Sequence, residues 1–285
     1  MTTKGAQLHP DTGVLATSLL VALDGSAFAE RAIGPAGRLA ARLGVPLCLW
    51  SVAPTATDAE ARRPAIAALA KASGARCELL VGERPADAIV SAAGAAGGHP
   101  LVCLATHGRD HSAPLVHSTS AALVAASAGP VLLVGPAVPA EPPAPGRLAV
   151  CVDGNPESDD RIMVAAMAWA GALDLGVTVL TVAEPVPESI RNPGSYPRLH
   201  GPHGDADAYV ASLAGAWNGD VPVSGRAVYD PVDVDGALVR AFAADPTELV
   251  VMGTRAPRGL RRLILGSTAA AVAHGSPAPV LVVPL

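Results

Sequence analysis

A glycine-rich stretch near the end of the chain combines bare backbone, hydroxyl groups and positive charge. Glycine lets backbone N–H groups approach an anion closely, and a helix expected to begin near Ser267 would add free N–H donors and a positive dipole end. The guanidinium of Arg255 could neutralise phosphate charge. We therefore predict an anion-binding loop, although a purely structural loop stays open as the alternative. Its candidate residues are Met252, Gly253, Arg255, Gly266, Ser267 and Thr268.

The loop matches neither of the common phosphate-binding motifs. No Lys follows a glycine in the register of a Walker A loop, and the spacing is not that of G-x-G-x-x-G. Any phosphate contact would therefore depend on the helix start and on nearby arginines at positions 255, 258, 261 and 262.

Two Asp-Gly pairs, at Asp24 and Asp153, each follow an apolar run. An Asp at the end of a strand can aim its carboxylate into a crevice, where it could accept hydrogen bonds from an adenine amino group or a ribose hydroxyl. The alternative is that each Asp only organises a turn or caps a helix.

Other residue types that could do chemistry give weaker patterns. His107, His111 and His117 cluster near Asp110, but they lack the paired helical spacing of a zinc site, so we predict no metal. The four cysteines form no C-x-x-C pair and are expected to be buried in a reducing compartment. The sequence contains no nucleophile elbow, and we predict no catalytic residue.

The elements that would position these residues occur twice in the same order. The run SLLVALDGSAFAERAI (18–33) resembles RLAVCVDGNPESDDRI (147–162), and HPLVCLATHGRD (99–110) resembles TELVVMGTRAPR (247–258). A proline-rich segment lies between the copies. We predict one domain at 1–136, a linker at 137–146 and a second domain at 147–285, with an extra loop of unknown role around 184–205.

Within each copy, strand-like runs alternate with helix-like stretches. This alternation predicts an α/β fold with two tandem doubly wound (Rossmann-like) domains, each with a five-stranded, mostly parallel sheet. Ligands bind such sheets at the carboxyl ends of the strands, where the strand order reverses. We expect Gly34-Pro35 to interrupt the first helix, and we expect the closing strands 131–134 and 280–283 to be edges for exchange between domains or between chains.

Composition excludes several classes of protein. Half of the residues are hydrophobic and the net charge is −5, which favours a packed globular protein and argues against a nucleic-acid partner. We find no apolar stretch of the ~20 residues that a membrane helix needs and no signal-peptide pattern. We therefore expect a cytoplasmic protein that does not bind membranes.

Taken together, these motifs resemble the universal stress protein family in a tandem two-domain form. The resemblance rests on LVALDGS, RPADAI, the closing runs GPVLLVG and APVLVVP, and the glycine loop followed by Ser or Thr. The family contains ATP binders and members that do not bind ATP. Carried onto this sequence, the resemblance implies an ATP site at Asp153, Val182, Gly253, Gly266 and Ser267, and a second one at Asp24, Val52, Gly108 and Thr119.

Both copies depart from the family's glycine pattern. The first has Ala105 at the first glycine position and Ser118 at the third, while the second has Ala256 at the middle position. Ser118 would bring a Cβ close to a phosphate, and Asp110 would oppose its charge. We therefore rank the second site ahead of the first.

The resulting prediction is an ATP-binding stress or regulatory protein that acts as a nucleotide-dependent signalling or interaction module. It would bind ATP with or without Mg²⁺, form a homodimer, contact an unknown protein partner and hydrolyse ATP weakly at most. The alternative is a family member without nucleotide that acts through dimerisation and protein contacts. An adenylating ligase is disfavoured because its signatures are missing from the sequence.

Overall fold

The computed structural model describes residues 15–106, 119–141, 146–183, 206–230, 232–254 and 265–285. Its strands form one continuous ten-stranded sheet in the order β3-β2-β1-β4-β5-β10-β9-β6-β7-β8. The strands are β1 (Ser18–Leu23), β2 (Leu47–Ala53), β3 (Arg76–Val81), β4 (Pro100–Ala105), β5 (Val131–Val134), β6 (Arg147–Cys151), β7 (Val177–Ala183), β8 (Val223–Tyr229), β9 (Thr247–Thr254) and β10 (Val280–Pro284).

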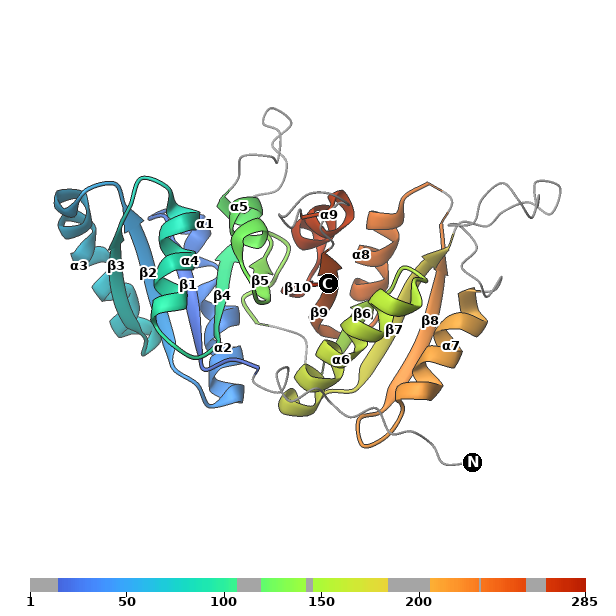
Figure 1. The fold of residues 1–285 in the computed structure, drawn as a ribbon. Helices are drawn as coiled ribbons and strands as arrows, with labels where there is room; N and C mark the ends of the chain where they lie inside the picture. The colour runs from blue at the N-terminus through green and yellow to red at the C-terminus, as the bar shows by residue number, and fades with distance from the viewer. Residues whose placement is uncertain (1–14, 107–118, 142–145, 184–205, 231, 255–264) are drawn as a thin grey trace.

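Each half contributes five strands that are parallel to one another, and the two halves meet where β5 and β10 pair in the antiparallel direction. The predicted α/β class with a mostly parallel doubly wound sheet is confirmed. The closing strands expected to be exchange edges pair with each other inside the chain, so the two predicted sheets merge into one (Figure 1).

Helices cover both faces of this sheet. Buried residues of α1, α2, α3, α6 and α7 join one core layer, and those of α4, α5, α8 and α9 join the other. The helices are α1 (Ala27–Glu30), α2 (Ile33–Leu43), α3 (Ala56–Ser73), α4 (Pro85–Ala95), α5 (Thr119–Ala126), α6 (Pro156–Leu173), α7 (Ala206–Trp217), α8 (Val234–Ala244) and α9 (Ser267–Gly275).

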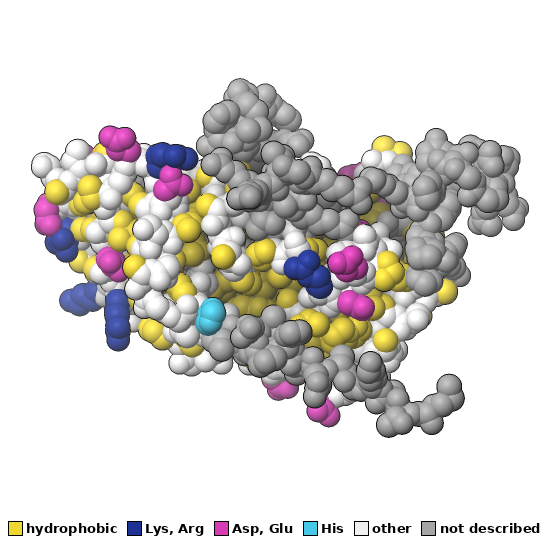
Figure 2. Space-filling model, viewed as in Figure 1, with side chains coloured by type: hydrophobic (Ala, Val, Ile, Leu, Met, Phe, Trp, Pro, Cys, Tyr) yellow, Lys and Arg dark blue, Asp and Glu magenta, His cyan; other side chains and the backbone are white. Residues whose placement is uncertain are grey.

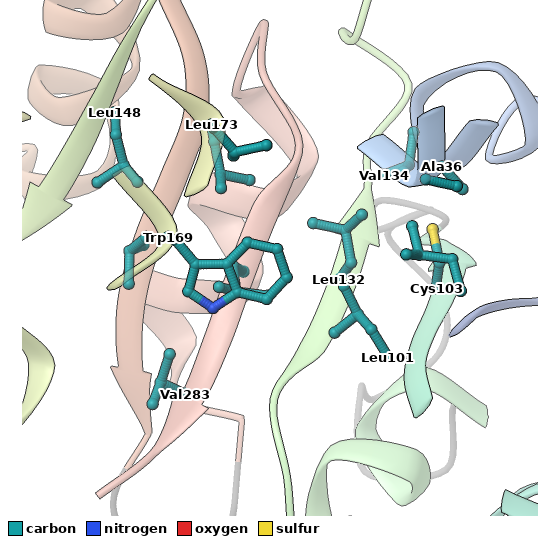
Figure 3. Packing of buried hydrophobic residues seen from close by; sticks show 14 of the residues in the cluster. Ala36, Leu101, Cys103, Leu132, Val134, Leu148, Trp169, Leu173 and Val283 are labelled. Atoms are coloured by element: carbon teal, nitrogen blue, oxygen red, sulfur yellow. The ribbon is translucent and has the colours of Figure 1, made fainter. Parts of the chain in front are cut away.

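The first core layer continues across the junction between the halves. Figure 3 shows Trp169 and Leu173 of α6 on one side and Leu132 of β5 on the other, and all three are nearly fully buried. In the view of Figure 2, hydrophobic side chains gather between the halves, and charged side chains lie on the outer part of the first half and in a second group on the second half. Burial of apolar surface therefore contributes to holding the halves together.

An ion pair between Arg42 and Glu248 joins the halves at their junction. Within the first half, the guanidinium of Arg31 donates to the carbonyl oxygens of Pro136 (2.7 Å) and Val138 (3.3 Å) in the segment that follows β5. Val138, inside the segment expected to be a linker, is buried in the core. The described part of this segment therefore packs against the first half.

The expected interruption of the first helix is present. The break falls at Arg31–Ala32, one turn before Pro35, because a proline at position 35 has no N–H to donate to the carbonyl four residues earlier. One local expectation needs correction. The cysteines are not all buried: Cys103 is, but Cys77 is exposed. Cys77 lies on β3, which is an outer edge of the sheet and is covered less than the central strands.

Candidate functional site

A pocket of about 400 Å³ opens at the carboxyl ends of β6, β7 and β9 in the second half. Strand order reverses here, because β6 pairs with β7 on one side and β9 on the other. Such a switch point is where open α/β sheets hold their ligands, and the volume falls in the range of roughly 300–1,000 Å³ typical of small-molecule sites.

The pocket brings together seven of the residues predicted from the sequence: Asp153, Val182, Met252, Gly253, Gly266, Ser267 and Thr268. Arg255 lies outside the described residues. In the first half, Asp24 and Thr119 are exposed and Val52 is buried in β2. Gly108 and Ser118, together with the histidine cluster, lie outside the described residues.

One wall of the pocket is the loop between β6 and α6. Gly154 adopts a positive φ of 79°, which favours glycine and turns the chain. Asp153 Oδ1 accepts a hydrogen bond from the Asn155 N–H at 3.2 Å, and Asn155 caps α6 by accepting from Glu157 and Ser158. One oxygen of Asp153 thus organises the turn, as the structural alternative expected, while the residue also lines the pocket.

The side chain of Asp159, in α6, hydrogen-bonds to the backbone of this loop. Its carboxylate accepts hydrogen bonds from the backbone N–H groups of Asp153 (3.2 Å) and Gly154 (3.0 Å), and the Tyr209 hydroxyl donates to its Oδ2. The Asp159 side chain lies in the pocket lining although the residue is only 2% exposed. The sequence analysis missed both residues.

Burial governs the protonation of this group. Loss of solvent raises the pKa of Asp159 above its ordinary value, although the hydrogen bonds from Tyr209 and the loop partly oppose the rise. Burial and the hydrogen bond to Asp159 also raise the pKa of Tyr209, so the phenol stays protonated and remains a donor at neutral pH.

The opposite wall is the start of α9. Gly266 occupies the N-cap position of α9 with φ −62° and ψ 156°. Because glycine has no side chain, no side-chain hydrogen bond caps the helix. The first N–H groups of α9, together with the hydroxyls of Ser267 and Thr268, are therefore the donors of this wall. A Cβ added to Gly266 would meet none of the described atoms within 4 Å, so within the described part of the chain the backbone here borders open space. A helix N-terminus of this kind attracts anions.

The floor of the pocket is apolar. Met252, Leu238 and Ile162 line it from β9, α8 and α6, and the Leu285 side chain lies directly over Gly253. Burial raises the pKa of the Cys151 thiol to about 12, so this lining sulfur stays protonated and is a poor nucleophile. The floor can accept a flat apolar group such as a purine ring.

Charge in the described part of the lining is one-sided. Asp153 and Asp159 are its acidic members, and no basic side chain belongs to this part. Within the described ranges, no group of His, Cys, Asp or Glu is arranged to hold a metal ion.

The model of the universal stress protein family matches the chain twice, over residues 17–135 and 146–284. The chain belongs to this family. The two matches identify it as a tandem two-domain universal stress protein, as the sequence motifs had indicated. A search of curated proteins found no match.

Solved structures show the same fold in this family. A universal stress protein from Archaeoglobus fulgidus DSM 4304 is 19% identical and aligns with a TM-score of 0.64 over 94% of this chain and 98% of its own. A putative universal stress protein from Pseudomonas aeruginosa UCBPP-PA14 is 20% identical, with a TM-score of 0.63 over 96% and 95% of the two chains.

A shorter match is a universal stress protein in complex with cAMP. It is 28% identical and covers 42% of this chain and 96% of its own, with a TM-score of 0.37.

Among the described helices, none combines the length and the apolarity required to cross a membrane.

Proposed function

We propose that this universal stress protein binds ATP in the pocket of its second half and uses occupancy of that pocket as a regulatory signal. The observation that carries the proposal is the pairing of two walls across one pocket. The Asp153 loop can accept hydrogen bonds, and the start of α9 can donate them.

These walls match the two ends of a nucleotide. The carboxylate of Asp153 suits the adenine amino group or the ribose hydroxyls, since both are hydrogen-bond donors. Gly266 and Ser267 at the start of α9 suit the phosphates, because free N–H groups and the helix dipole favour negative charge there. The apolar floor between the walls suits the purine ring.

The phosphates would bring Mg²⁺ with them, since this ion is usually held by one or two carboxylates and the phosphates of its substrate. On the described phosphate wall, the oxygen atoms that could join its coordination shell are the hydroxyls of Ser267 and Thr268. The proposal concerns binding, and ATP hydrolysis is no part of it.

Calorimetric titration of ATP and Mg²⁺ into wild type and Asp153→Asn tests the proposal. The asparagine keeps the size and the turn-forming oxygen but removes the charge. Loss of one charge-assisted hydrogen bond costs about 1.5–3 kcal/mol, which corresponds to a roughly 10- to 150-fold weaker Kd. Nucleotide released from the denatured protein, counted per chain, gives an independent stoichiometry.

Asp24→Asn is the matched control, because Asp24 holds the same place after β1 and also accepts from the residue two positions later. We expect its Kd to stay within about 2-fold of wild type. If Asp24→Asn weakened ATP binding and Asp153→Asn did not, the ATP site would lie in the first half. No binding to wild type, and no released nucleotide, would contradict the proposal and favour a module that works through protein contacts alone.

We also propose that the protein acts in the cytoplasm as a homodimer with a separate protein partner. Because β5 and β10 pair with each other, the surface joining two chains must lie elsewhere, and the outer strands β3 and β8 are the remaining ends of the sheet. Light scattering coupled to size exclusion should give twice the chain mass of 28.4 kDa, and a single-chain mass would contradict the dimer.

A further inference from the structure

Burying the Asp159 carboxylate in the wall of a ligand pocket costs free energy of desolvation. Removing a carboxylate from water is costly unless hydrogen bonds replace its hydration. Asp159 is 2% exposed, and its bonds go to the backbone N–H groups of Asp153 and Gly154. The charge is therefore placed to fix the course of one particular loop.

Tyr209 secures this carboxylate from a different element. Its hydroxyl donates to Asp159 Oδ2 although 50 positions separate the two residues in the sequence. The contact depends on close packing of α7 on β8, since a Cβ on Gly225 would lie 3.0 Å from the Val210 Cβ and would overlap its carbonyl group. The loop after β6 is thus tied through Asp159 to α7, which packs on β7 and β8 in the same core layer as α6.

The equivalent loop of the first half is organised differently. Glu30 stands where Asp159 stands, six residues after the Asp of the Asp-Gly pair. Ser26 makes the short contacts to Asp24, at 2.9 Å from its N–H and 2.6 Å from its hydroxyl. Among the described residues, no bond from the Glu30 side chain to this loop corresponds to the bonds of Asp159.

We propose that Asp159 and Tyr209 are positioning residues of the second-half pocket, holding the Asp153–Gly154 backbone so that the Asp153 carboxylate is aimed before the ligand arrives. The inference rests on the proposed binding of ATP. A loop that is already ordered loses less conformational entropy on binding, so the bonds from Asp159 would favour binding in the second half.

Tyr209→Phe in the full chain tests this assignment, because the ring stays and only the donor to Asp159 is lost. Amide hydrogen exchange of the Asp153 and Gly154 N–H groups, measured without ligand, should become faster. The Kd for ATP should rise by more than about 2-fold, up to the roughly 150-fold that loss of a whole hydrogen bond to a carboxylate would cost.

Tyr229→Phe is a matched control. Tyr229 also donates to an aspartate, Asp207 in α7, at 2.8 Å, but on the exposed surface. Its loss should leave both the amide exchange and the Kd within about 2-fold of wild type. Equal melting temperatures for the two variants would show that α7 still packs on β8 in both.

Three probes separate positioning from a general loss of structure. Asp153 is assigned to the adenosine end, so Tyr209→Phe should weaken adenosine and ATP by the same factor and leave inorganic tripolyphosphate unchanged. A variant that weakened all three equally would act through the fold, and the positioning role would be wrong.

The remaining outcomes are also decisive. If wild type binds ATP while Tyr209→Phe changes neither exchange nor Kd, the positioning role fails and the proposed function stands. Faster amide exchange in Tyr209→Phe with an unchanged Kd for ATP would likewise overturn the positioning role. If wild type binds none of the three probes, the proposed function fails and the positioning role fails with it.

Discussion

The Gly135→Ala substitution tests the junction between the two halves most directly. Gly135 follows β5 and lies against the last turn of α9 in the second half. A Cβ at this position would overlap the Ala273 carbonyl oxygen and would lie 3.0 Å from the His274 oxygen. Because these are backbone atoms of a helix, no side-chain rotation can relieve the overlap, and either the strand or the helix must shift.

The expected cost is that of overpacking a buried site, about 1–3 kcal/mol. For a chain in which both halves unfold together, each kcal/mol lowers the midpoint by about 2–4 °C. The melting temperature of Gly135→Ala should therefore fall by roughly 2–12 °C in scanning calorimetry.

Gly129→Ala serves as the control for this prediction. Gly129 lies just before β5, and a Cβ there would meet no atom within 4 Å. Its φ is not among the positive values, so alanine should be neutral or slightly stabilising. A melting temperature of Gly135→Ala within about 1 °C of wild type would refute the close approach of Gly135 to α9, and with it the described junction.

Three further predictions concern the second half and its contacts. Gly225→Ala should lower stability by about 1–3 kcal/mol in thermal unfolding, since its Cβ would overlap the carbonyl of Val210, and an unchanged midpoint would contradict the close packing of α7 on β8. A double-mutant cycle on Arg42 and Glu248, whose side chains are 36% and 26% exposed, should give a coupling of at most about 1 kcal/mol that shrinks in high salt; a larger, salt-independent value would oppose this. Burial raises the pKa of Asp159 in the folded state, so its stabilising contribution is present below the ordinary Asp pKa and is lost as pH rises through the raised value. Asp159→Asn should therefore gain stability relative to wild type as pH increases. A stability difference that does not vary with pH would count against the raised pKa of Asp159.

Much of the fold could be predicted because the sequence is duplicated. Alternating strand-like and helix-like runs identify the parallel sheets, and parallel strands bring their carboxyl ends to one edge. For this reason Asp153 and Gly266 were assigned to one crevice although they are far apart in the chain. The structure places both in the lining of one pocket, while their role in binding remains a prediction.

The parts that could not be predicted depend on contacts between distant elements. Nothing in the local sequence couples Asp159 to Tyr209, since their meeting depends on how α7 packs against β8. Likewise Cys77 lies in a strand that carries Arg76 and Glu78 on either side of it, and its exposure follows from the place of β3 at the edge of the sheet. The loop arginines, Arg255 among them, lie outside the described residues, so their part in the site remains a sequence prediction.

Helix α9 has different neighbours at its two ends. Its first residue, Ser267, lines the pocket, whereas Ala273 in its last turn lies against Gly135 of the other half. The helix is nine residues long, which corresponds to about 13 Å at the rise of an α-helix, and so short a rod moves as a unit. If a bound phosphate displaced α9, the shift would have to be accommodated at Gly135, and reciprocity would then require that a change at Gly135 alter the affinity of the pocket by the same coupling free energy.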